Sequence, residues 1–450
     1  MKKYDICIIG AGPAGYKAAL ILAKNGKNVL LIDKNEKRIG GTCLNEGCIP
    51  AKNYLESANY LGKFSYFASR GLKGKTDDFD IRLLKTKTDE LLDTLRLGLQ
   101  KKLSIGGVKF EYGEAVFISK NEVKVNDKII QADKFIIATG SIHKEHPVLA
   151  IDEKYIISSK EVFKLEKLPK DILIVGAGAI GCEFANFFNF TGSNVHLCEF
   201  TSSILPFEDK DVSDTVQREY KKQGIKVDIN TTVKEYGIIN KKIIITFEKN
   251  GKTFDGAFDK VLISIGRIPN TKQIGLDKAG VKSDERGFVE IDSLYKTTNE
   301  HIYAIGDVVA TPSLAHMASY EAKKIAFDIL KFAPLKESVI PNVVFATPQV
   351  GSVGENEKSL KEKEIPYNVK KLFLKSLGMP KIKGNDSGFV KLLFDEREFL
   401  IGASLVGYDM TEIINQVAIC INAKLKKDDI LSMIFAHPTM SESFYKTLEG

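Results

Sequence analysis

Residues 4–15 decide the fold of this chain and read Tyr-Asp-Ile-Cys-Ile-Ile-Gly-Ala-Gly-Pro-Ala-Gly. The first six are mostly apolar and have the length of a buried strand, and the glycines that follow lead into a helical stretch over residues 16–25. A second apolar run over residues 29–32 ends at Asp33. The pattern predicts a strand, a tight turn, a helix and a second, parallel strand.

The same pattern occurs a second time in the middle of the chain. A strand-like run over residues 172–175 precedes residues 176–181, which read Gly-Ala-Gly-Ala-Ile-Gly. A helical stretch follows over residues 182–190, and a further strand over 194–197 ends shortly before Glu199. Two copies of Gly-x-Gly-x-x-Gly, each followed about 20 residues later by an acid, predict two dinucleotide sites. The alternative is two strand-turn-helix corners without a ligand.

Each position of this motif has a physical reason. The first glycine permits a tight turn, the second lets the backbone approach a pyrophosphate, and the third lets the helix pack closely on its strand. The helix N-terminus offers unpaired N–H groups to the phosphates. The terminal acid would accept hydrogen bonds from ribose hydroxyls and repel the extra phosphate of NADP. These roles fall to Gly10, Gly12, Gly15 and Asp33 in the first copy, and to Gly176, Gly178, Gly181 and Glu199 in the second.

Composition and charge exclude several classes of protein. A chain of 450 residues exceeds what one core usually organises, and 44% hydrophobic with 27% charged residues is typical of folded protein. The 65 basic residues barely exceed the 58 acidic ones, so we expect no nucleic acid partner. No apolar run approaches the roughly 20 residues that span a bilayer. The N-terminus lacks an uninterrupted signal segment, so we expect a cytoplasmic protein.

Residues 40–52 read Gly-Gly-Thr-Cys-Leu-Asn-Glu-Gly-Cys-Ile-Pro-Ala-Lys and place Cys43 and Cys48 across a glycine-containing turn. Pro50 suits the first turn of a helix, whose dipole would stabilise a thiolate together with Lys52. We therefore expect at least one thiol to have a pKa well below the value of about 8.5 for free cysteine, and to take part in thiol–disulfide exchange. A zinc site is the alternative, but no Cys or His spacing supplies the two further ligands, so we expect no metal.

Further segments end strands in small-residue turns. Residues 133–140 end in Ala-Thr-Gly, residues 259–266 end in Gly before Arg267, and residues 302–307 end in Gly-Asp. After Pro334 the sequence predicts apolar strands over residues 342–345, 368–374, 388–394 and 400–405, and then helices from Met410 onward, which is typical of an α+β domain. The chain also carries His-Pro-Thr at 437–439 and Ser-Glu at 441–442.

In combination these segments resemble the flavoprotein disulfide reductases, most closely the members that reoxidise dihydrolipoamide, over nearly the whole chain. The resemblance implies an α/β fold with two Rossmann-like dinucleotide-binding domains, for FAD and NAD, and an α+β C-terminal dimerisation domain. The implied domains are the first part of the FAD-binding domain at 1–145, the NAD-binding domain at 146–265, a central domain completing the FAD site at 266–335, and the interface domain at 336–450.

The resemblance also implies roles for single residues. Cys43 matches the thiol that exchanges with the substrate, and Cys48 matches the thiol in charge-transfer contact with the flavin. Lys52 matches a lysine near flavin N5 that pairs with Glu183. Asp307 matches the aspartate on the FAD ribityl chain. Further cofactor-binding positions are Gly41, Thr42, Thr139, Gly140, Gly266, Arg267, Gly306 and Ala315.

His437 matches the acid/base, which the family supplies to the cysteines of the other subunit, with Glu442 orienting it. The spacing agrees, because a histidine five residues before Glu442 can place an imidazole N–H on the carboxylate. The resemblance thus implies a homodimer. It also implies a partner, the lipoyl carrier domain of a 2-oxo acid dehydrogenase or glycine cleavage complex.

Three positions depart from the family pattern. Glu46 stands where a small apolar residue is common, and we expect its charge to raise the thiol pKa values and to disfavour acidic substrates. Ala179 stands where some relatives carry a larger residue that shields the flavin, so we expect a more open nicotinamide pocket. Residues 141–143, Ser-Ile-His, lack the usual proline.

Three alternatives to a lipoamide enzyme stay open. Glutathione-type reductases are similar but use basic residues for NADPH where Glu199 stands. Mercuric reductases carry an additional C-terminal cysteine pair, whereas the last cysteine here is Cys420. A non-catalytic subunit that binds FAD or a lipoyl carrier is the third, although Cys43, Cys48 and His437 are all present.

Overall fold

The computed structural model describes residues 3–74 and 79–449. Their contacts group the chain into two compact units. The first unit comprises residues 1–53, 83–144 and 266–336, and the second comprises residues 54–82, 145–265 and 337–450. The four-domain division with its boundaries stays a prediction. Among the described residues, no helix combines the length and apolar character that crossing a bilayer requires.

The first unit is built on a sheet with β1 (Lys3–Ile9) at its centre. Parallel partners flank β1 on both sides, β2 (Val29–Asp33) and β6 (Lys128–Ile137), as the sequence predicts for the first motif. The order continues as β3-β2-β1-β6-β5-β4, and β17 pairs with β6. The outer strands are β3 (Lys109–Tyr112), β4 (Ala115–Ser119), β5 (Glu122–Val125) and β17 (Ile302–Ala304).

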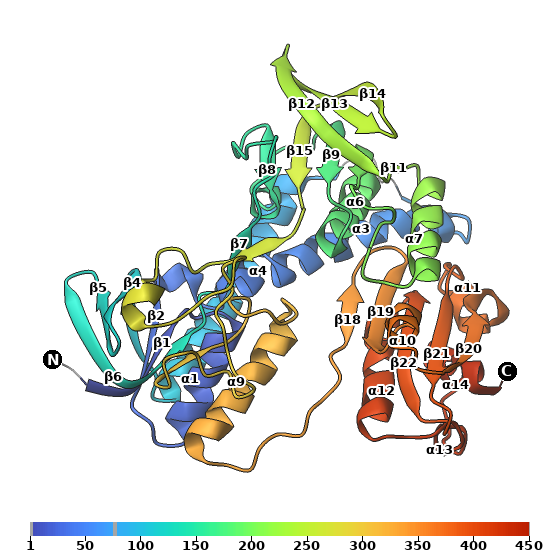
Figure 1. The fold of residues 1–450 in the computed structure, drawn as a ribbon. Helices are drawn as coiled ribbons and strands as arrows, with labels where there is room; N and C mark the ends of the chain where they lie inside the picture. The colour runs from blue at the N-terminus through green and yellow to red at the C-terminus, as the bar shows by residue number, and fades with distance from the viewer. Residues whose placement is uncertain (1–2, 75–78, 450) are drawn as a thin grey trace. The chain divides into compact units, whose positions relative to one another are not determined.

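Helices α1 (Pro13–Lys24) and α9 (Ala315–Leu330) pack side by side in this unit (Figure 1). The helix α1 begins at Pro13, three residues before the predicted start, because Pro fits the first turn and Gly12 is the N-cap. The other helices and strands of the first unit are α2 (Gly41–Asn45), the start of α3 (Cys48–Ala68), α4 (Ile81–Ile105), α8 (Leu276–Ala279), β7 (Ser141–His143) and β16 (Arg267–Pro269), with a 3-10 turn at Glu36–Arg38.

The second unit repeats the parallel arrangement around β9 (Asp171–Val175), in the order β11-β10-β9-β15-β8. Gly178 is the N-cap of α6, as Gly12 is of α1. A three-stranded antiparallel sheet, β12-β13-β14, adjoins it, which the sequence analysis did not identify (Figure 1). The elements are β8 (Ile156–Ser158), α5 (Ser159–Val162), α6 (Ala179–Phe190), β10 (Asn194–Cys198), α7 (Lys210–Lys222), β11 (Lys226–Asp228), β12 (Thr231–Ile239), β13 (Lys242–Lys249), β14 (Lys252–Phe258) and β15 (Lys260–Ile263).

The C-terminal part of this unit is an antiparallel sheet in the order β18-β19-β22-β21-β20. Helix α12 (Met410–Asn422) packs on β19 and β22 and closes an apolar core. Four of the strands match predicted runs, and β19 (Gln349–Gly354) was missed. The other elements are β18 (Asn342–Val344), α10 (Glu357–Glu362), β20 (Asn368–Phe373), a 3-10 turn (Leu374–Ser376), α11 (Gly378–Ile382), β21 (Phe389–Phe394), β22 (Leu400–Gly407), α13 (Lys427–Leu431) and α14 (Glu442–Glu449). The predicted fold class is confirmed.

Candidate functional site

The first and third glycines of both motifs have no room for a side chain. A Cβ on Gly10 would lie 2.2 Å from a backbone oxygen, and one on Gly15 would lie 1.8 Å from the Gly10 oxygen. In the second motif, a Cβ on Gly176 would lie 2.6 Å from a backbone oxygen and one on Gly181 would lie 1.9 Å from the Gly176 oxygen. These glycines therefore allow the close approach of turn, strand and helix that the sequence predicts.

The middle glycines, in contrast, are not crowded by protein atoms. A Cβ on Gly12 would find its nearest atom at 3.9 Å, and one on Gly178 would find nothing within 4 Å. Both residues are N-caps of helices, and neither cap carries a side-chain hydrogen bond. The helix N–H groups and the space in front of them are thus available to a pyrophosphate. Both motifs therefore fit the pyrophosphate of a dinucleotide, and the assignment of FAD to the first and NAD to the second stays a prediction.

The acids that end the second strand of each motif bind the glycine turn itself. The Ala11 N–H donates to Asp33 Oδ2 at 2.7 Å, and the Ala177 N–H donates to Glu199 Oε2 at 2.6 Å. Glu199 also accepts from the Thr201 N–H and hydroxyl. Burial raises the pKa of Asp33, although hydrogen bonds from the backbone of Ala11 and Lys34 lower it. In both copies the acid thus accepts a hydrogen bond from the backbone of the glycine turn. The ribose contacts of both acids stay predictions.

Cys43 and Cys48 are brought together at the junction of two helices. Cys43 lies in α2, Cys48 opens α3, and both are thiols in this structure. Gly47 lies between them where a Cβ would approach the Thr42 oxygen to 2.9 Å. Asn45 holds the turn by donating to the carbonyl of Gly41 at 2.8 Å. The predicted pair is therefore held in one tight turn at the start of a helix.

The pKa of Cys43 differs from the expectation. Its hydrogen bond with Cys48, its burial and the negative charge of Cys48 raise the pKa, and the cation of Lys52 lowers it only in part. The thiol with the low pKa that the sequence predicts is therefore not Cys43. The hydrogen bond couples the two sulfurs, and which of them carries the thiolate stays a prediction.

Glu46 forms an ion pair that the sequence analysis did not foresee. The Arg38 guanidinium donates to both Glu46 oxygens, at 2.9 and 3.4 Å. Arg38 offsets the charge that we expected to act on the thiols, and the main causes of the raised Cys43 pKa do not include Glu46. Ala179, the second departure, is exposed at the start of α6.

Asp307 is held by a chain of hydrogen bonds. The Ser141 hydroxyl donates to Asp307 Oδ2 at 2.6 Å, and Arg267 Nε donates to Ser141 Oγ at 2.7 Å. Burial lowers the pKa of Arg267, while the negative charges of Asp307 and Glu46 raise it. Ser141 thus orients Asp307, the residue predicted to bind the ribityl chain. The segment that contains Ser141 forms β7, which pairs with β16. Sequence reasoning missed this residue because its partners lie more than 100 positions away.

The remaining predicted flavin-side residues occupy neighbouring turns of the same unit. The Thr139 hydroxyl donates to the Asn270 carbonyl at 2.8 Å, and the Asn270 N–H donates to the Gly140 carbonyl at 2.9 Å. Ala315 is the first residue of α9. A Cβ on Gly140 or Gly266 would meet nothing within 4 Å, so both turns can approach a ligand.

Glu183 and His437 belong to the second unit, whereas the cysteines and Lys52 belong to the first. Glu183 is buried on α6, where its Oε1 accepts from the Phe345 N–H at 3.0 Å. The pairing of Lys52 with Glu183 and the action of His437 on the cysteines stay predictions.

His437 and Glu442 form the predicted pair. His437 Nδ1 lies 2.9 Å from Glu442 Oε1, and the Thr439 N–H donates to the other oxygen at 3.0 Å. The hydrogen bond from His437 lowers the pKa of Glu442. The His437 side chain is 81% exposed, so its Nε2 is presented outward while the carboxylate holds Nδ1.

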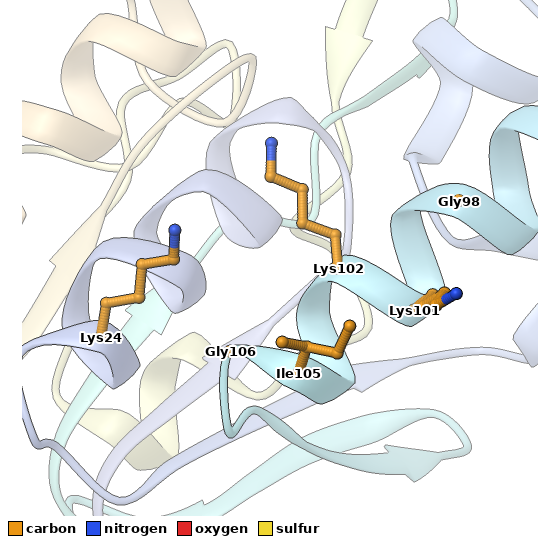
Figure 2. A pocket seen from close by; sticks show the side chains of 6 residues that line it. All are labelled: Lys24, Gly98, Lys101, Lys102, Ile105 and Gly106. Atoms are coloured by element: carbon orange, nitrogen blue, oxygen red, sulfur yellow. The ribbon is translucent and has the colours of Figure 1, made fainter.

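A surface depression of about 500 Å³ lies away from these residues (Figure 2). Its lysines come from the C-terminal turn of α1 and the end of α4, namely Lys24, Lys101 and Lys102. Lysines favour helix C-termini because they complement the negative end of the dipole. None of the predicted site residues lines this depression.

Comparisons with known proteins agree with this geometry. Residues 4–322 match the pyridine nucleotide-disulphide oxidoreductase family, and residues 340–448 match its dimerisation domain. Dihydrolipoyl dehydrogenase of Chlamydia trachomatis serovar D is 33% identical over 98% of this chain and 95% of its own length. The enzyme of the same name from Bacillus subtilis is 32% identical over 98% of this chain and 97% of its own length.

Solved structures agree as well. The HOCl-induced flavoprotein disulfide reductase RclA from Escherichia coli superposes with a TM-score of 0.89 at 28% identity, over 99% of both chains. LpdA from Mycobacterium tuberculosis shares the fold, with a TM-score of 0.90 at 21% identity over 100% of this chain and 99% of its own. With its two motifs, its cysteine turn and its matches over nearly the full length, this chain belongs to the pyridine nucleotide-disulphide oxidoreductase family.

Proposed function

We propose that this protein is an FAD-dependent oxidoreductase that oxidises dihydrolipoamide to lipoamide and reduces NAD. The observation that carries the proposal is the cysteine turn, where Cys43 is hydrogen-bonded to Cys48 at the start of α3. Curated relatives named dihydrolipoyl dehydrogenase, which match 98% of this chain, support the substrate.

The chain's own residues account for the substrate half-reaction. His437 accepts a proton from one thiol of the dihydrolipoyl group, with Glu442 stabilising the imidazolium. The resulting thiolate attacks Cys43 Sγ in the Cys43–Cys48 disulfide, and the S–S bond breaks to leave Cys48 as a thiolate. The second substrate thiol then attacks the substrate sulfur that is bound to Cys43, the mixed disulfide breaks, and the proton of this thiol passes to the released Cys43 sulfur. The substrate leaves as the oxidised cyclic disulfide, with one proton on His437 and one on Cys43.

FAD, when bound, accepts the electron pair from the dithiol and passes it as a hydride to NAD. Gly12 and Gly178 leave the two helix N-termini open for the phosphates of these cofactors. The raised pKa of Cys43 supports the assignment of the flavin-facing thiolate to Cys48, which the family resemblance implies.

The active form is a homodimer in this proposal. The chain carries the family's dimerisation domain, and Ile434, three residues before His437, is 99% exposed. The adjacent Met433 is 42% exposed, and neighbouring exposed apolar side chains beside the proposed acid/base support a surface that a second subunit covers. Mixed dimers of Cys43→Ser and His437→Ala subunits should regain turnover, and failure despite subunit exchange contradicts a shared site.

The partner that carries the substrate is a lipoyl domain of a 2-oxo acid dehydrogenase or glycine cleavage complex. The deciding experiment compares purified protein with dihydrolipoamide and NAD against glutathione disulfide and NADPH. We expect turnover with the first pair and negligible turnover with the second. The reverse result contradicts the proposed substrate and cofactor.

A further inference from the structure

Helix α9 carries a carboxylate in its buried face. Of the seven buried residues of α9, six are Met317, Ala318, Ala322, Ile325, Ala326 and Ile329, and the seventh is Glu321. The exposed fraction of Glu321 is 0%. A buried carboxylate costs several kcal/mol unless hydrogen bonds compensate it, so its partners define what it does.

Both oxygens of Glu321 bind the segment that follows β17. The Gly306 N–H donates to Oε2 at 2.5 Å, and the Thr311 hydroxyl donates to Oε1 at 2.6 Å. Burial raises the pKa of Glu321 to about 7, although these two hydrogen bonds lower it. The negative charge of Asp307 also raises the pKa of Glu321, and the positive charge of Lys324 lowers it.

The segment that Glu321 binds is the turn that presents Asp307. Gly306 has φ of +74°, and a Cβ there would lie 3.2 Å from Ala14 and 3.7 Å from Ala318. The turn is thus confined between α1 and α9, with its backbone N–H directed at Glu321. Asp307 extends from the other side of this turn to Ser141.

We propose that Glu321 is a positioning residue for FAD, which fixes the Gly306–Asp307 turn so that Asp307 meets the flavin's ribityl chain. The inference rests on the FAD site of the proposed function and adds a residue that touches only the turn. Without the carboxylate, the Gly306 N–H loses its acceptor in a buried place and the turn relaxes.

Asp328 provides a matched control on the same helix, seven residues further along. It accepts from the Tyr303 hydroxyl at 2.8 Å and does not contact the turn. Glu321→Ala and Asp328→Asn both remove a hydrogen-bonded acid from α9, but only the first acts on residues 306–311. Glu321→Gln keeps one acceptor in the same shape and serves if the alanine variant fails to fold.

The test measures the dissociation constant of FAD for apoprotein, by the change in flavin fluorescence, together with the Tm of each apoprotein. The loss of a hydrogen bond to a charged group corresponds to a rise in the dissociation constant of roughly 10-fold to 100-fold for Glu321→Ala. We expect a smaller rise for Glu321→Gln and the wild-type value for Asp328→Asn.

An unchanged dissociation constant in both Glu321 variants overturns the inference, as does an equal rise in Asp328→Asn. A lower Tm without weaker FAD binding also overturns it, since Glu321 would then serve the fold alone. FAD binding needs no lipoyl substrate. A wild-type protein that binds FAD without oxidising dihydrolipoamide therefore contradicts the proposed function and leaves the role of Glu321 standing.

Discussion

The buried ammonium of Lys391 offers a prediction whose size follows from its contacts. Lys391, on β21, is 1% exposed and donates to Asp209, Asp211 and Glu357, each at 2.8 Å. The three carboxylates lie within 4.8 Å of one another, and the ammonium stands where a cation would bind. It ties β21 to the start of α7 and to the start of α10.

Lys391→Met leaves three carboxylates together without their cation. Breaking a buried ion pair from one side costs about 3–5 kcal/mol, and each kcal/mol lowers the Tm of a domain of this size by roughly 2–4 °C. We therefore expect a loss of roughly 6–20 °C. Lys371→Met is the control, because Lys371 is 27% exposed, pairs with Asp211 and covers the Phe389 ring, contacts worth about 1–2 kcal/mol.

The assay is thermal unfolding followed by circular dichroism over a range of pH. The pKa values of Asp211 and Glu357 are both lowered in the folded protein, although burial raises them. The cause is hydrogen bonding, from Lys371 and Lys391 to Asp211 and from Lys391 to Glu357. A lowered folded pKa contributes stability above the unfolded value of about 4, which is lost as the pH falls through the folded pKa. Acid also relieves repulsion in the variant, so the gap to wild type should narrow below about pH 5. Equal Tm losses in both variants, or a gap that widens in acid, refute this reasoning.

Three further predictions concern the reaction. His437→Ala should lose about 10²–10⁴-fold of lipoamide turnover, but far less with a quinone that takes electrons from the flavin, and equal losses would assign His437 to folding. Glu199→Arg should shift the ratio of catalytic efficiencies from NAD toward NADP, and comparable efficiencies in the wild type contradict the role of Glu199. Glu46→Val leaves the Arg38 cation near the thiols without its partner, so turnover of free, carboxylated lipoate should rise relative to that of neutral lipoamide. High salt should remove this effect. A salt-independent ratio rules out the electrostatic role of Glu46.

The sequence predicts what depends on short spacings. The glycines of both motifs, the acids at 33 and 199 and the cysteine turn all act within about 30 residues, and the hydrogen bond from the glycine turn to the acid recurs in both copies. The sequence could not predict pairs that join distant segments. Ser141 meets Asp307 across 166 positions. Glu321 lies only 15 positions from Gly306, but it looks like an ordinary residue of an amphipathic helix, because no motif shows that the turn folds back onto the helix.

Other misses concern local contacts that no motif marks. Residues 231–258 form a separate antiparallel sheet, which depends on hairpin pairing rather than on a motif. The charge of Glu46 could be read from the sequence, but its partner Arg38 lies eight residues earlier, before the turn that brings the two together. A search for opposite charges flanking the cysteine turn could have found this pair.

The most direct test of the account is an anaerobic titration of the holoenzyme with dihydrolipoamide, followed by absorption, for wild type, Cys43→Ser and Cys48→Ser. We expect the two-electron-reduced wild type to show long-wavelength absorption from a thiolate beside the flavin. Cys48→Ser should lack this absorption, and Cys43→Ser should keep the thiolate–flavin contact but lose exchange with the substrate. If both variants turn over lipoamide at the wild-type rate, the Cys43–Cys48 pair is not the redox centre.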